Sequence, residues 1–445
     1  MSADGRFVAF HSIASNLVPG DTNGAADIFV HDRQKGDTER VSLSSSGEEG
    51  DSHSVEPSIS ADGRYVAFES AAINLVPGDT NGRWDIFVRD RQTGVTERVS
   101  VSSTGEQGNH HSRRPSISAD GRFVAFESDA TNLVPDDTNG VRDTFVHDRQ
   151  TGVTERVSVD SSGEQGNSWS EHTSISSDGR FVAFHSIASN LVPDDTNSAI
   201  DIFVHDLQTG VTERVSLSSK GEQGNGDSFS PSISADGRFV AFDSNATNLV
   251  ADDTNGARDI FVHDRQKGDT ERVNLSSSGE QGNSWSERSS ISADGRFVAF
   301  QSIASNFVPG DTNDAWDVFV RDRETGVTER VSVSSSGEQG DDSSILSSVS
   351  ADGRFVAFMS LATNLVPDDT NDARDIFVHD RGAPLPCPWD LTGSGSIGAA
   401  DLAGVLGCWG TYTPADPCEA ADFTNTGDVG SADLANLLGN WGPCP

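Results

Sequence analysis

Apolar and polar positions recur along this chain with a fixed period. The tripeptide Asp-Gly-Arg begins at residues 4, 62, 120, 178, 236, 294 and 352, so the repeating unit is 58 residues long. Each unit contains four short runs rich in Val, Ile and Phe, bounded by turn residues and without a helical period. In the second unit these runs cover 64–70, 85–90, 96–102 and 115–118. The pattern predicts four β-strands per unit.

Four strands per repeat are typical of a β-propeller blade. Several strands place apolar residues at adjacent positions, as in 123–126 and 260–262, which suits a sheet covered on both faces by neighbouring blades. A solenoid is the structural alternative, but its units are usually shorter and carry one strand per face. The sequence therefore predicts an all-β fold over residues 1–381, a seven-bladed β-propeller of four-stranded antiparallel blades.

The first and last units are incomplete. Met1 stands where other units have Ile59 or Ile117, so the first unit lacks the Pro-Ser-Ile-Ser strand. The last unit reaches Arg381 without a Thr-Glu-Arg-Val-Ser strand. We expect a weakened seam between blades 7 and 1. The N-terminus shows no secretory signal, and we expect an upstream stretch to carry both a signal peptide and the lost strand.

The repeat also carries a family resemblance. Its runs Pro-Ser-Ile-Ser-Ala-Asp-Gly-Arg-Phe-Val-Ala-Phe, Asp-Ile-Phe-Val-His-Asp-Arg and Thr-Glu-Arg-Val-Ser resemble the TolB-type, WD-like propeller repeat over residues 2–381. The resemblance implies the fold. It does not assign a function, because the same architecture serves binding proteins, peptidase accessory domains and sugar-active enzymes.

Acidic residues dominate the charge. With 69 acidic and 31 basic residues, the formal net charge is -38. Such a surface repels phosphate backbones and anionic lipids, so nucleic acid and bare membrane are poor partners, whereas cations, neutral polymers and basic surfaces remain open. No apolar run approaches the roughly 20 residues that span a bilayer. Solubility alone is the other explanation of the acidity.

The two faces of the predicted disc differ in sequence. The tight Asp-Gly and Gln-Thr-Gly turns share one face and scarcely vary, whereas the long second-to-third and inter-blade connections share the other. The inter-blade loops vary most and carry the candidate ligand-binding residues His110, His111, Trp169, Phe229 and Trp285. Aromatic rings mixed with His, Arg and Glu can stack on sugars or hold a peptide. The alternative is that these loops are merely unconstrained.

The second-to-third loops contain a stricter pattern of oxygen-bearing side chains. Carboxylates and amides at relative positions 1, 3 and 7 suit Ca²⁺, although Asp-Thr-Asn-Gly is also a good turn. The candidate ligands are Asp21, Asn23 and Asp27; Asp79, Asn81 and Asp85; Asp137, Asn139 and Asp143; Asp195, Asn197 and Asp201; Asp253, Asn255 and Asp259; Asp311, Asn313 and Asp317; and Asp369, Asn371 and Asp375. Both interpretations, turn and calcium loop, stay open.

Beyond a linker at 382–389, residues 390–445 form a different kind of domain. Two twelve-residue loops, 390–401 and 422–433, each have Gly at position six, an aliphatic residue at eight and Asp at twelve, and each leads into an Ala/Leu-rich segment predicted to be helical. This is the spacing of an EF-hand loop. The duplicated loop-plus-helix arrangement resembles a dockerin, a calcium-dependent module that docks onto a cohesin domain.

The dockerin resemblance implies two calcium sites. Their ligands would be Asp390, Thr392, Ser394, Ser396 (by its carbonyl) and Asp401, and Asp422, Thr424, Thr426, Asp428 (by its carbonyl) and Asp433. Thr and Ser replace the family's Asn or Asp at positions three and five, so we expect weaker calcium binding than in typical members. The alternative is an EF-like hairpin that no longer binds metal.

All four cysteines, Cys387, Cys408, Cys418 and Cys444, lie in the C-terminal region. An even set in so small a domain indicates disulfides and an oxidising compartment, hence an extracellular or cell-surface location. We favour Cys387 with Cys444 and Cys408 with Cys418 among the three pairings. Zinc is less favoured because no Cys-x-x-Cys pair is present.

No residue is singled out as catalytic, because the Asp and Glu positions recur in blade after blade, although His110, His111 and His172 could be acid/base groups. The sequence favours a secreted, non-catalytic binding or scaffold propeller attached to a partner through its C-terminal module. The alternative is a polysaccharide-active hydrolase or lyase. A histidine or carboxylate pair in only one or two blades would favour the enzyme, whereas seven equivalent oxygen-lined pockets would favour binding.

Overall fold

The structure is a computed structural model. It describes residues 1–382 and, beyond them, only scattered positions. The chain divides into two units, Met1–Asp380 and Arg381–Pro445. In the second unit the described strands are β27 (Ser396–Ile397), β28 (Gly410–Thr411), β29 (Asp428–Val429) and β30 (Gly442–Pro443), paired as β27 with β30 and β28 with β29.

Most of the dockerin-like loops and all four cysteines lie outside the described residues. Ser396 and Asp428, the two predicted carbonyl ligands, begin β27 and β29. The predicted ligands Asp390, Thr392, Ser394, Asp401, Asp422, Thr424, Thr426 and Asp433 are not described. The dockerin, its calcium sites and the disulfides therefore stay predictions.

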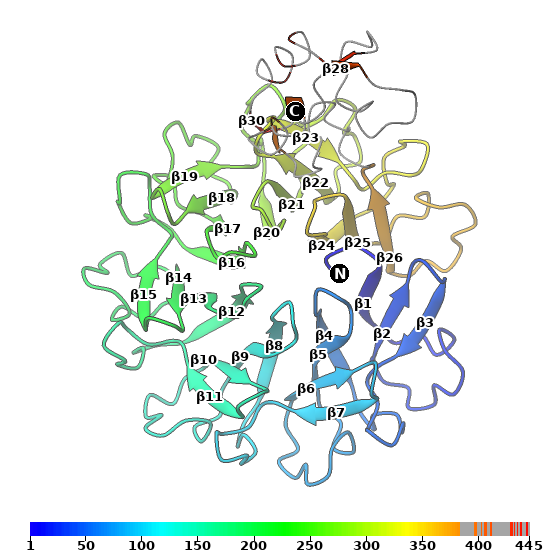
Figure 1. Cartoon of the computed structure of the whole chain (residues 1–445), viewed down its shortest axis with the longest axis vertical. Helices are drawn as coiled ribbons and strands as arrows, with labels where there is room; N and C mark the ends of the chain where they lie inside the picture. The colour runs from blue at the N-terminus through cyan, green and yellow to red at the C-terminus, as the bar shows by residue number, and fades with distance from the viewer. Residues whose placement is uncertain are drawn as a thin grey trace. The chain divides into compact units, whose positions relative to one another are not determined.

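The first unit is a ring of seven sheets, each a meander of sequential antiparallel strands (Figure 1). Blade 1 comprises β1 (Phe7–Ser12), β2 (Asp27–Asp32) and β3 (Asp37–Arg40); blade 2 comprises β4 (Ser54–Ile59), β5 (Tyr65–Ser70), β6 (Asp85–Asp90) and β7 (Val95–Arg98); and blade 3 comprises β8 (Ser112–Ile117), β9 (Phe123–Ser128), β10 (Asp143–Asp148) and β11 (Val153–Arg156). Blade 4 comprises β12 (Ser170–Ile175), β13 (Phe181–Ser186), β14 (Asp201–Asp206) and β15 (Val211–Arg214), and blade 5 comprises β16 (Ser228–Ile233), β17 (Phe239–Ser244), β18 (Asp259–Asp264) and β19 (Asp269–Arg272). Blade 6 comprises β20 (Ser286–Ile291), β21 (Phe297–Ser302), β22 (Asp317–Asp322) and β23 (Val327–Arg330), and blade 7 comprises β24 (Ser344–Val349), β25 (Phe355–Ser360) and β26 (Asp375–Asp380).

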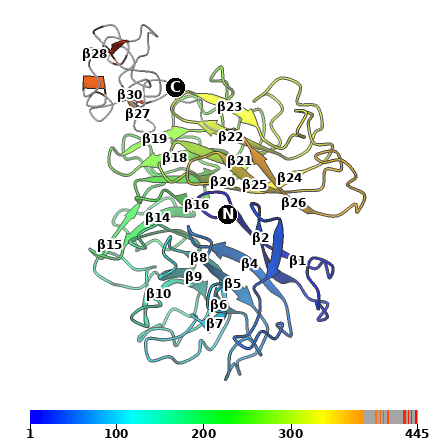
Figure 2. The same cartoon turned by 45° about the vertical axis from the view of Figure 1, so that its right-hand side comes forward.

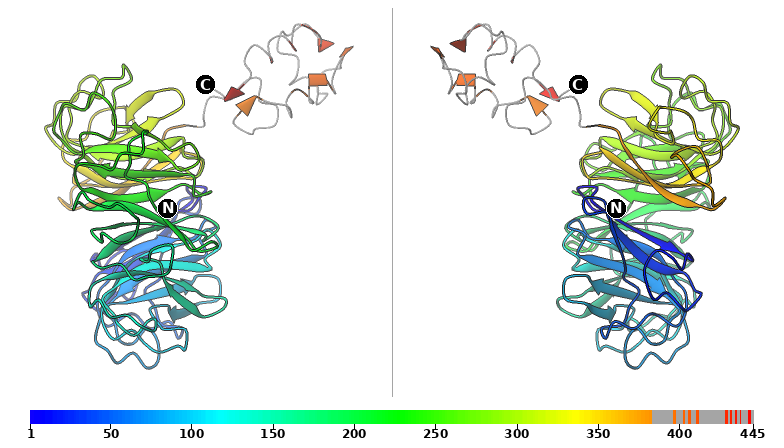
Figure 3. Two further views of the ribbon diagram at one scale, coloured as in Figure 1. Left: turned by 90° about the vertical axis from the view of Figure 1, so that its left-hand side faces the viewer. Right: turned by 90° about the vertical axis from the view of Figure 1, so that its right-hand side faces the viewer.

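The predicted seven-bladed, all-β fold is confirmed for this unit. Five blades have four strands, and blades 1 and 7 have three because their sequences lack the inner and the outer strand respectively. Seen edge-on, the blades form a flat disc (Figure 3), and in the axial view their inner strands surround its centre (Figure 1), where a propeller has its central channel.

The apolar second and third strands of each blade form the core. In blade 2, Val66, Ala67 and Phe68 are fully buried, and Phe68 stacks on Phe87 with ring centroids 6.0 Å apart. The same pair recurs in every blade, for example as Phe126 on Phe145 at 5.9 Å. Because consecutive strand residues point to opposite faces, burial of all three requires a neighbouring blade on each side. Radial stacking supplies both.

The inner strand differs from its prediction. It begins three residues earlier, at Ser112 in blade 3, because the Ser112 hydroxyl bonds that of Ser128 and a β-bulge between Arg113 and Ser116 lets the pairing continue. The residue in the bulge has a left-handed backbone, with φ of 50° at Arg114. Residues that the sequence assigned to the loop ahead of this strand, such as Ser112 and Arg113, therefore belong to the strand itself and pair with its neighbour.

Backbone hydrogen bonds close the ring at the tight-turn end. The amide of Ala3 donates to the carbonyl of Ala61 at 3.0 Å, Ala61 donates to Ala119 in turn, and the series ends when Ala351 donates to Ala3 at 2.9 Å. Arg33 also covers the Phe355 ring at 4.3 Å, as Arg91 covers Phe7 at 4.5 Å in the next joint. Blades 1 and 7 lie side by side (Figures 1 and 2). The interface between blades 7 and 1 therefore keeps the hydrogen bond and the Arg33–Phe355 contact found at the other joints. It lacks the contacts that the inner strand of blade 1 and the outer strand of blade 7 would make.

Candidate functional site

One end of the channel collects the residues that vary between blades. The pairing of Ser54 with Ser70 and of Ser70 with Asp85 places the start of the inner strand, the end of the second and the start of the third at the same end. This end carries the long loops, and we call it the variable mouth. The Asp-Gly turns and the hydrogen-bonded ring lie at the opposite end.

Every tryptophan of the propeller lies at the variable mouth. Trp84 and Trp316 directly precede third strands, and Trp169 and Trp285 directly precede inner strands. Trp285 is the most open of them, with 55% of its surface exposed. The tight-turn end has no tryptophan among the described residues.

A second variable position lies just below the mouth, at the fifth residue of each second strand. It is occupied by His11, Glu69, Glu127, His185, Asp243, Gln301 and Met359 in blades 1 to 7. In blades 2 to 6 its side chain is buried and faces the bulge amide of the next blade. Arg114 N donates to Glu69 at 2.8 Å, and Leu346 N donates to Gln301 at 2.8 Å. The position was missed in the sequence, although its variation within an otherwise constant Phe-Val-Ala-Phe strand was a visible signal.

Burial perturbs the acids of this position. It raises the pKa of the Glu69 carboxyl to about 7, against the opposing effect of the Arg114 amide. Burial likewise raises the pKa of Asp243 to about 7, although the Arg258 guanidinium lies 3.3 Å away and opposes the shift. Both carboxyl groups therefore exchange protons near neutral pH, as general acids and bases do.

Blade 4 is the one blade within residues 1–382 that has an imidazole both at the buried position and in the bulge. His185 occupies the buried position and His172 the bulge, where its φ is 55°, and their ring centroids lie 4.8 Å apart. Burial lowers the pKa of His172 to about 2 and that of His185 to about 3, so both rings are neutral at pH 7. Trp169 and Phe229 each meet His185 edge to face at 5.8 Å.

Arginines and carboxylates surround this pair. Arg142 bonds Glu171 at 3.0 Å and Asp129 at 3.0 Å, and it contacts the fully buried Glu127 at 3.3 Å. Arg114 reaches Glu127 at 3.3 Å from the other side. On the next blade, Arg258 covers the ring of Phe229 at 4.6 Å.

The structure brings together only some of the predicted ligand-binding residues. Trp169 and Phe229 meet through His185, whereas Trp285 stands apart in blade 6. His110 and His111 contact each other edge to face at 5.0 Å in blade 3, and Nδ1 of His111 accepts the amide of Trp84 at 3.1 Å. His111 is therefore part of the blade 2 to blade 3 joint as well as a mouth residue.

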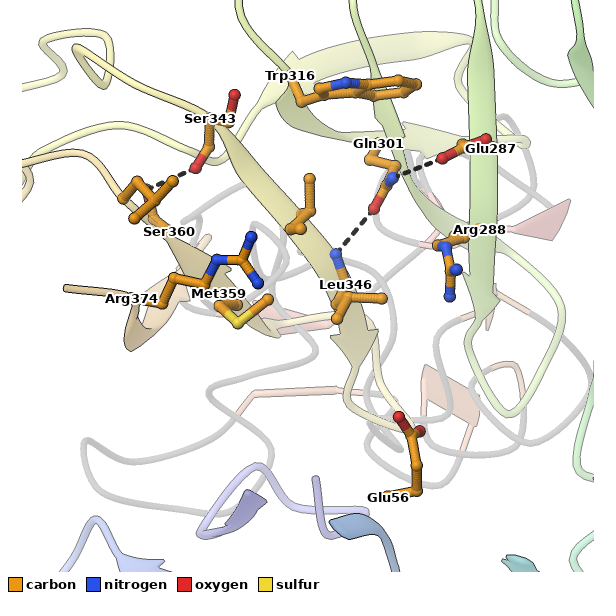
Figure 4. A pocket seen from close by; sticks show the side chains of 12 residues that line it. Glu56, Glu287, Arg288, Gln301, Trp316, Ser343, Leu346, Met359, Ser360 and Arg374 are labelled. Carbon is orange, nitrogen blue, oxygen red and sulfur yellow. Dashed lines mark hydrogen bonds between the residues drawn. The ribbon is translucent and has the colours of Figure 1, made fainter. Parts of the chain in front are cut away.

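A cavity of about 530 Å³ opens at the mouth beside blades 6 and 7 (Figure 4). Its apolar lining includes Trp316, Leu346 and Met359, and its charged lining includes Arg374 and Glu56. Glu56 belongs to blade 2 and reaches this cavity because blade 1 has no inner strand between them.

The Asp/Asn/Asp loops are held by protein groups. In blade 4, Arg214 lies 3.1 Å from both Asp195 and Asp201, Ser216 donates to Asp201 at 2.6 Å, and Asn197 donates to Asp201 at 2.9 Å. Arg40, Arg98, Arg156, Arg272 and Arg330 take the corresponding place in blades 1, 2, 3, 5 and 6. This geometry agrees with the turn interpretation, since a guanidinium already balances the carboxylates. Calcium at these loops stays a prediction.

Neither a protein-family model nor a curated protein matches the chain. Among solved structures, the β-propeller domain of the trilobed protease from Pyrococcus furiosus matches at a TM-score of 0.51 and 12% identity, over 85% of this chain and 93% of that one. The chain has the β-propeller fold. The oligogalacturonate lyase of Vibrio parahaemolyticus matches at a TM-score of 0.50 and 14% identity, over 85% and 88% of the two chains.

A putative TolB from Agrobacterium tumefaciens matches at a TM-score of 0.42 and 16% identity, over 79% of this chain and 96% of that one. The propellers matched thus include lyase, protease and TolB proteins, and the likeness extends to the fold alone. Among the described residues, no helix is long and apolar enough to cross a bilayer.

Proposed function

We propose that this protein is a glycan-binding propeller that holds a neutral polysaccharide across its variable mouth. The observation that carries the proposal is the gathering of all four propeller tryptophans at one end of the channel. Tryptophan combines a large apolar face with a polar edge, and such residues dominate binding energy where they lie exposed. The net charge of -38 favours a neutral polymer over an acidic one.

A glycan array probed with the full chain tests this proposal. We expect binding to neutral oligosaccharides and at least about a 10-fold loss for Trp285→Ser, since removing a stacking platform costs on the order of 1.4 kcal/mol or more. Serine is the residue of blade 7 at this position, Ser343, so the fold tolerates it.

Val95→Asp is the matched control. Val95 is exposed at the opposite end of the disc, and blades 1 and 5 have Asp37 and Asp269 there. Its binding should equal that of the unmodified chain. If no glycan binds, or if both variants lose glycan binding equally, the proposal is contradicted. If only peptides bind, the variable mouth is a peptide-binding site instead.

Hydrolysis or elimination of the bound polysaccharide is the second candidate function. The observation in its favour is the His172–His185 pair, because no other blade of the described propeller has a histidine both in the bulge and at the buried position of the second strand. Turnover that is lost in His172→Ser while binding persists would establish it.

From the sequence we further propose that the protein is extracellular, that its C-terminal loops bind calcium, and that its dockerin-like module attaches it to a protein partner.

A further inference from the structure

We propose that Glu171, His172 and His185 of blade 4 form a binding site for a divalent transition-metal ion of the zinc type. One ligand atom from each of the three residues lies within 4.8 Å of the other two. Two imidazoles and one carboxylate are a donor set that Zn²⁺ and its neighbours prefer, with a further position left for water. The site stands independently of the glycan proposal.

The fold holds the three side chains in place. Glu171 pairs with His185 across β12 and β13, which fixes their spacing. The bulge then turns His172 toward the same point, and the amide of His172 is held at 2.9 Å by Glu127 of blade 3. A β-bulge re-aims a side chain in this manner next to functional sites.

The imidazole nitrogens are available to a metal. Among the described residues, no hydrogen bond engages the ring of His172. The ring of His185 receives only the amide of Ser230, at 3.4 Å, which is long for a hydrogen bond.

Carboxyl and guanidinium groups surround the cluster in equal number. The carboxyl groups are Glu127, Asp129, Asp243 and Glu287, and the guanidinium groups are Arg114, Arg142, Arg258 and Arg288. Arg142 also bonds the ligand Glu171 at 3.0 Å, so the metal would share that carboxylate with the guanidinium. Trp169 and Phe229 flank His185 and shield it from water, which strengthens the attraction of these oxygens and nitrogens for a cation.

The combination of Glu171, His172 and His185 is not a consequence of the repeat, because the other blades have different residues at these positions. The equivalent residues are Val55, Glu56 and Glu69 in blade 2, Arg113, Arg114 and Glu127 in blade 3, Phe229, Ser230 and Asp243 in blade 5, Glu287, Arg288 and Gln301 in blade 6, and Ile345, Leu346 and Met359 in blade 7. None of these sets contains an imidazole. Blade 4 alone combines all three ligands.

Titration of the full chain with Co²⁺ tests the site, because this ion replaces Zn²⁺ and absorbs visible light. Cysteines are first alkylated and excess Ca²⁺ is present, so that thiols and oxygen-only loops do not contribute. We expect one equivalent of Co²⁺ bound at the mouth. Each ligand substitution should weaken binding by roughly 100-fold or more, since even an outer partner of a metal ligand is worth about 10- to 100-fold.

The variants come from the repeat itself. His185→Gln places the blade 6 residue in blade 4, and His172→Ser places the blade 5 residue there. His11→Gln makes the same change at the exposed equivalent position of blade 1 and should bind like the unmodified chain. Zn²⁺ should also raise the melting temperature of the unmodified chain and of His11→Gln, and not that of His172→Ser.

An unmodified chain that binds no Co²⁺ at micromolar concentration would overturn the proposal. Undiminished binding in both His185→Gln and His172→Ser would do so as well. If His185→Gln does not fold, the half-buried His172→Ser decides alone.

Discussion

Glu69 is a buried hydrogen-bond acceptor at the interface between blades 2 and 3. Burial in this interface disfavours the charged form of its carboxyl group. Its carboxyl accepts the amide of Arg114 at 2.8 Å, and burial raises its pKa to about 7. At the same position in blade 6, Gln301 accepts the Leu346 amide at the same distance without carrying an ionisable group. Above its pKa the ionised Glu69 therefore lowers the free energy of unfolding, whereas a glutamine at this position would not.

This difference predicts a pH dependence for Glu69→Gln. In the unfolded chain the carboxyl ionises near 4.5, whereas in the folded chain it keeps its proton up to about 7. Between these values the folded state binds more protons, so the stability contributed by Glu69 falls as pH rises and is constant above about 7. We expect Glu69→Gln to be more stable than the unmodified chain at pH 8 by on the order of 2–3 kcal/mol, and equal to it below pH ~4.

Urea unfolding at the two pH values measures this prediction. Glu106→Gln, at an exposed position in the loop that follows β7, is the control and should change little at either pH. A gain for Glu69→Gln that is the same at low and high pH would show that the carboxyl is not the cause.

The sequence predicted that Trp169 and Trp285 lie on the loops of the variable mouth. It did not predict the buried residues of the second strands that accept a backbone amide from the next blade. Trp169 and Trp285 stand out because they are large aromatic residues in the loops that vary most between repeats. His185 is one of these acceptors: its Nδ1 accepts the amide N–H of Ser230, one blade away, and the contact depends on a left-handed backbone at Ser230. Left-handed residues are usually glycine, and here a serine gives no such signal. The His172–His185 pair was hidden for the same reason.

The repeated sequence predicts the strands of each blade. The close packing of neighbouring blades depends on a glycine in the Asp-Gly turn. In the Asp-Gly turn of blade 3, Gly121 has φ of 74°, and a methyl group there would overlap the ring of Tyr65 in blade 2. Gly152, in the other tight turn of the blade, has φ of 73° with open space around it. The two glycines thus share a conformation and differ only in contact.

This pair predicts unequal effects of one substitution. Gly152→Ala meets only the left-handed strain and should cost about 1–2 kcal/mol. Gly121→Ala adds the overlap with Tyr65 and should cost about 2–5 kcal/mol, since overpacking adds about 1–3 kcal/mol. Urea unfolding at one pH compares them. Equal losses would mean that the blades do not pack at this joint as closely as described.

The elements were largely predictable because the period of 58 residues repeats the same strands seven times. The start of the inner strand was not. Its first residues, such as Ser112 and Arg113, lack the apolar pattern of a buried strand, because they pair beside a bulge at the edge of the channel. Residues assigned to a loop therefore proved to be strand residues that face the mouth.

The whole ring separates a constant end from a variable one. The constant end carries the tight turns and the hydrogen bonds that run from Ala3 through each blade and back to Ala3. The variable mouth carries the tryptophans, the histidine pair and the cavity beside blade 7. This division is what a binding scaffold requires, since the frame stays rigid while the exposed positions change.

Hydroxyl-radical footprinting of the full chain, with and without a bound oligosaccharide, tests the central claim that this mouth is the binding side. We expect the ligand to protect peptides containing Trp84, Trp169, Trp285 and Trp316 from oxidation. Peptides from the constant end, such as those containing Val95, Val153 and Val211, should react equally in both samples. Protection confined to the constant end would contradict it.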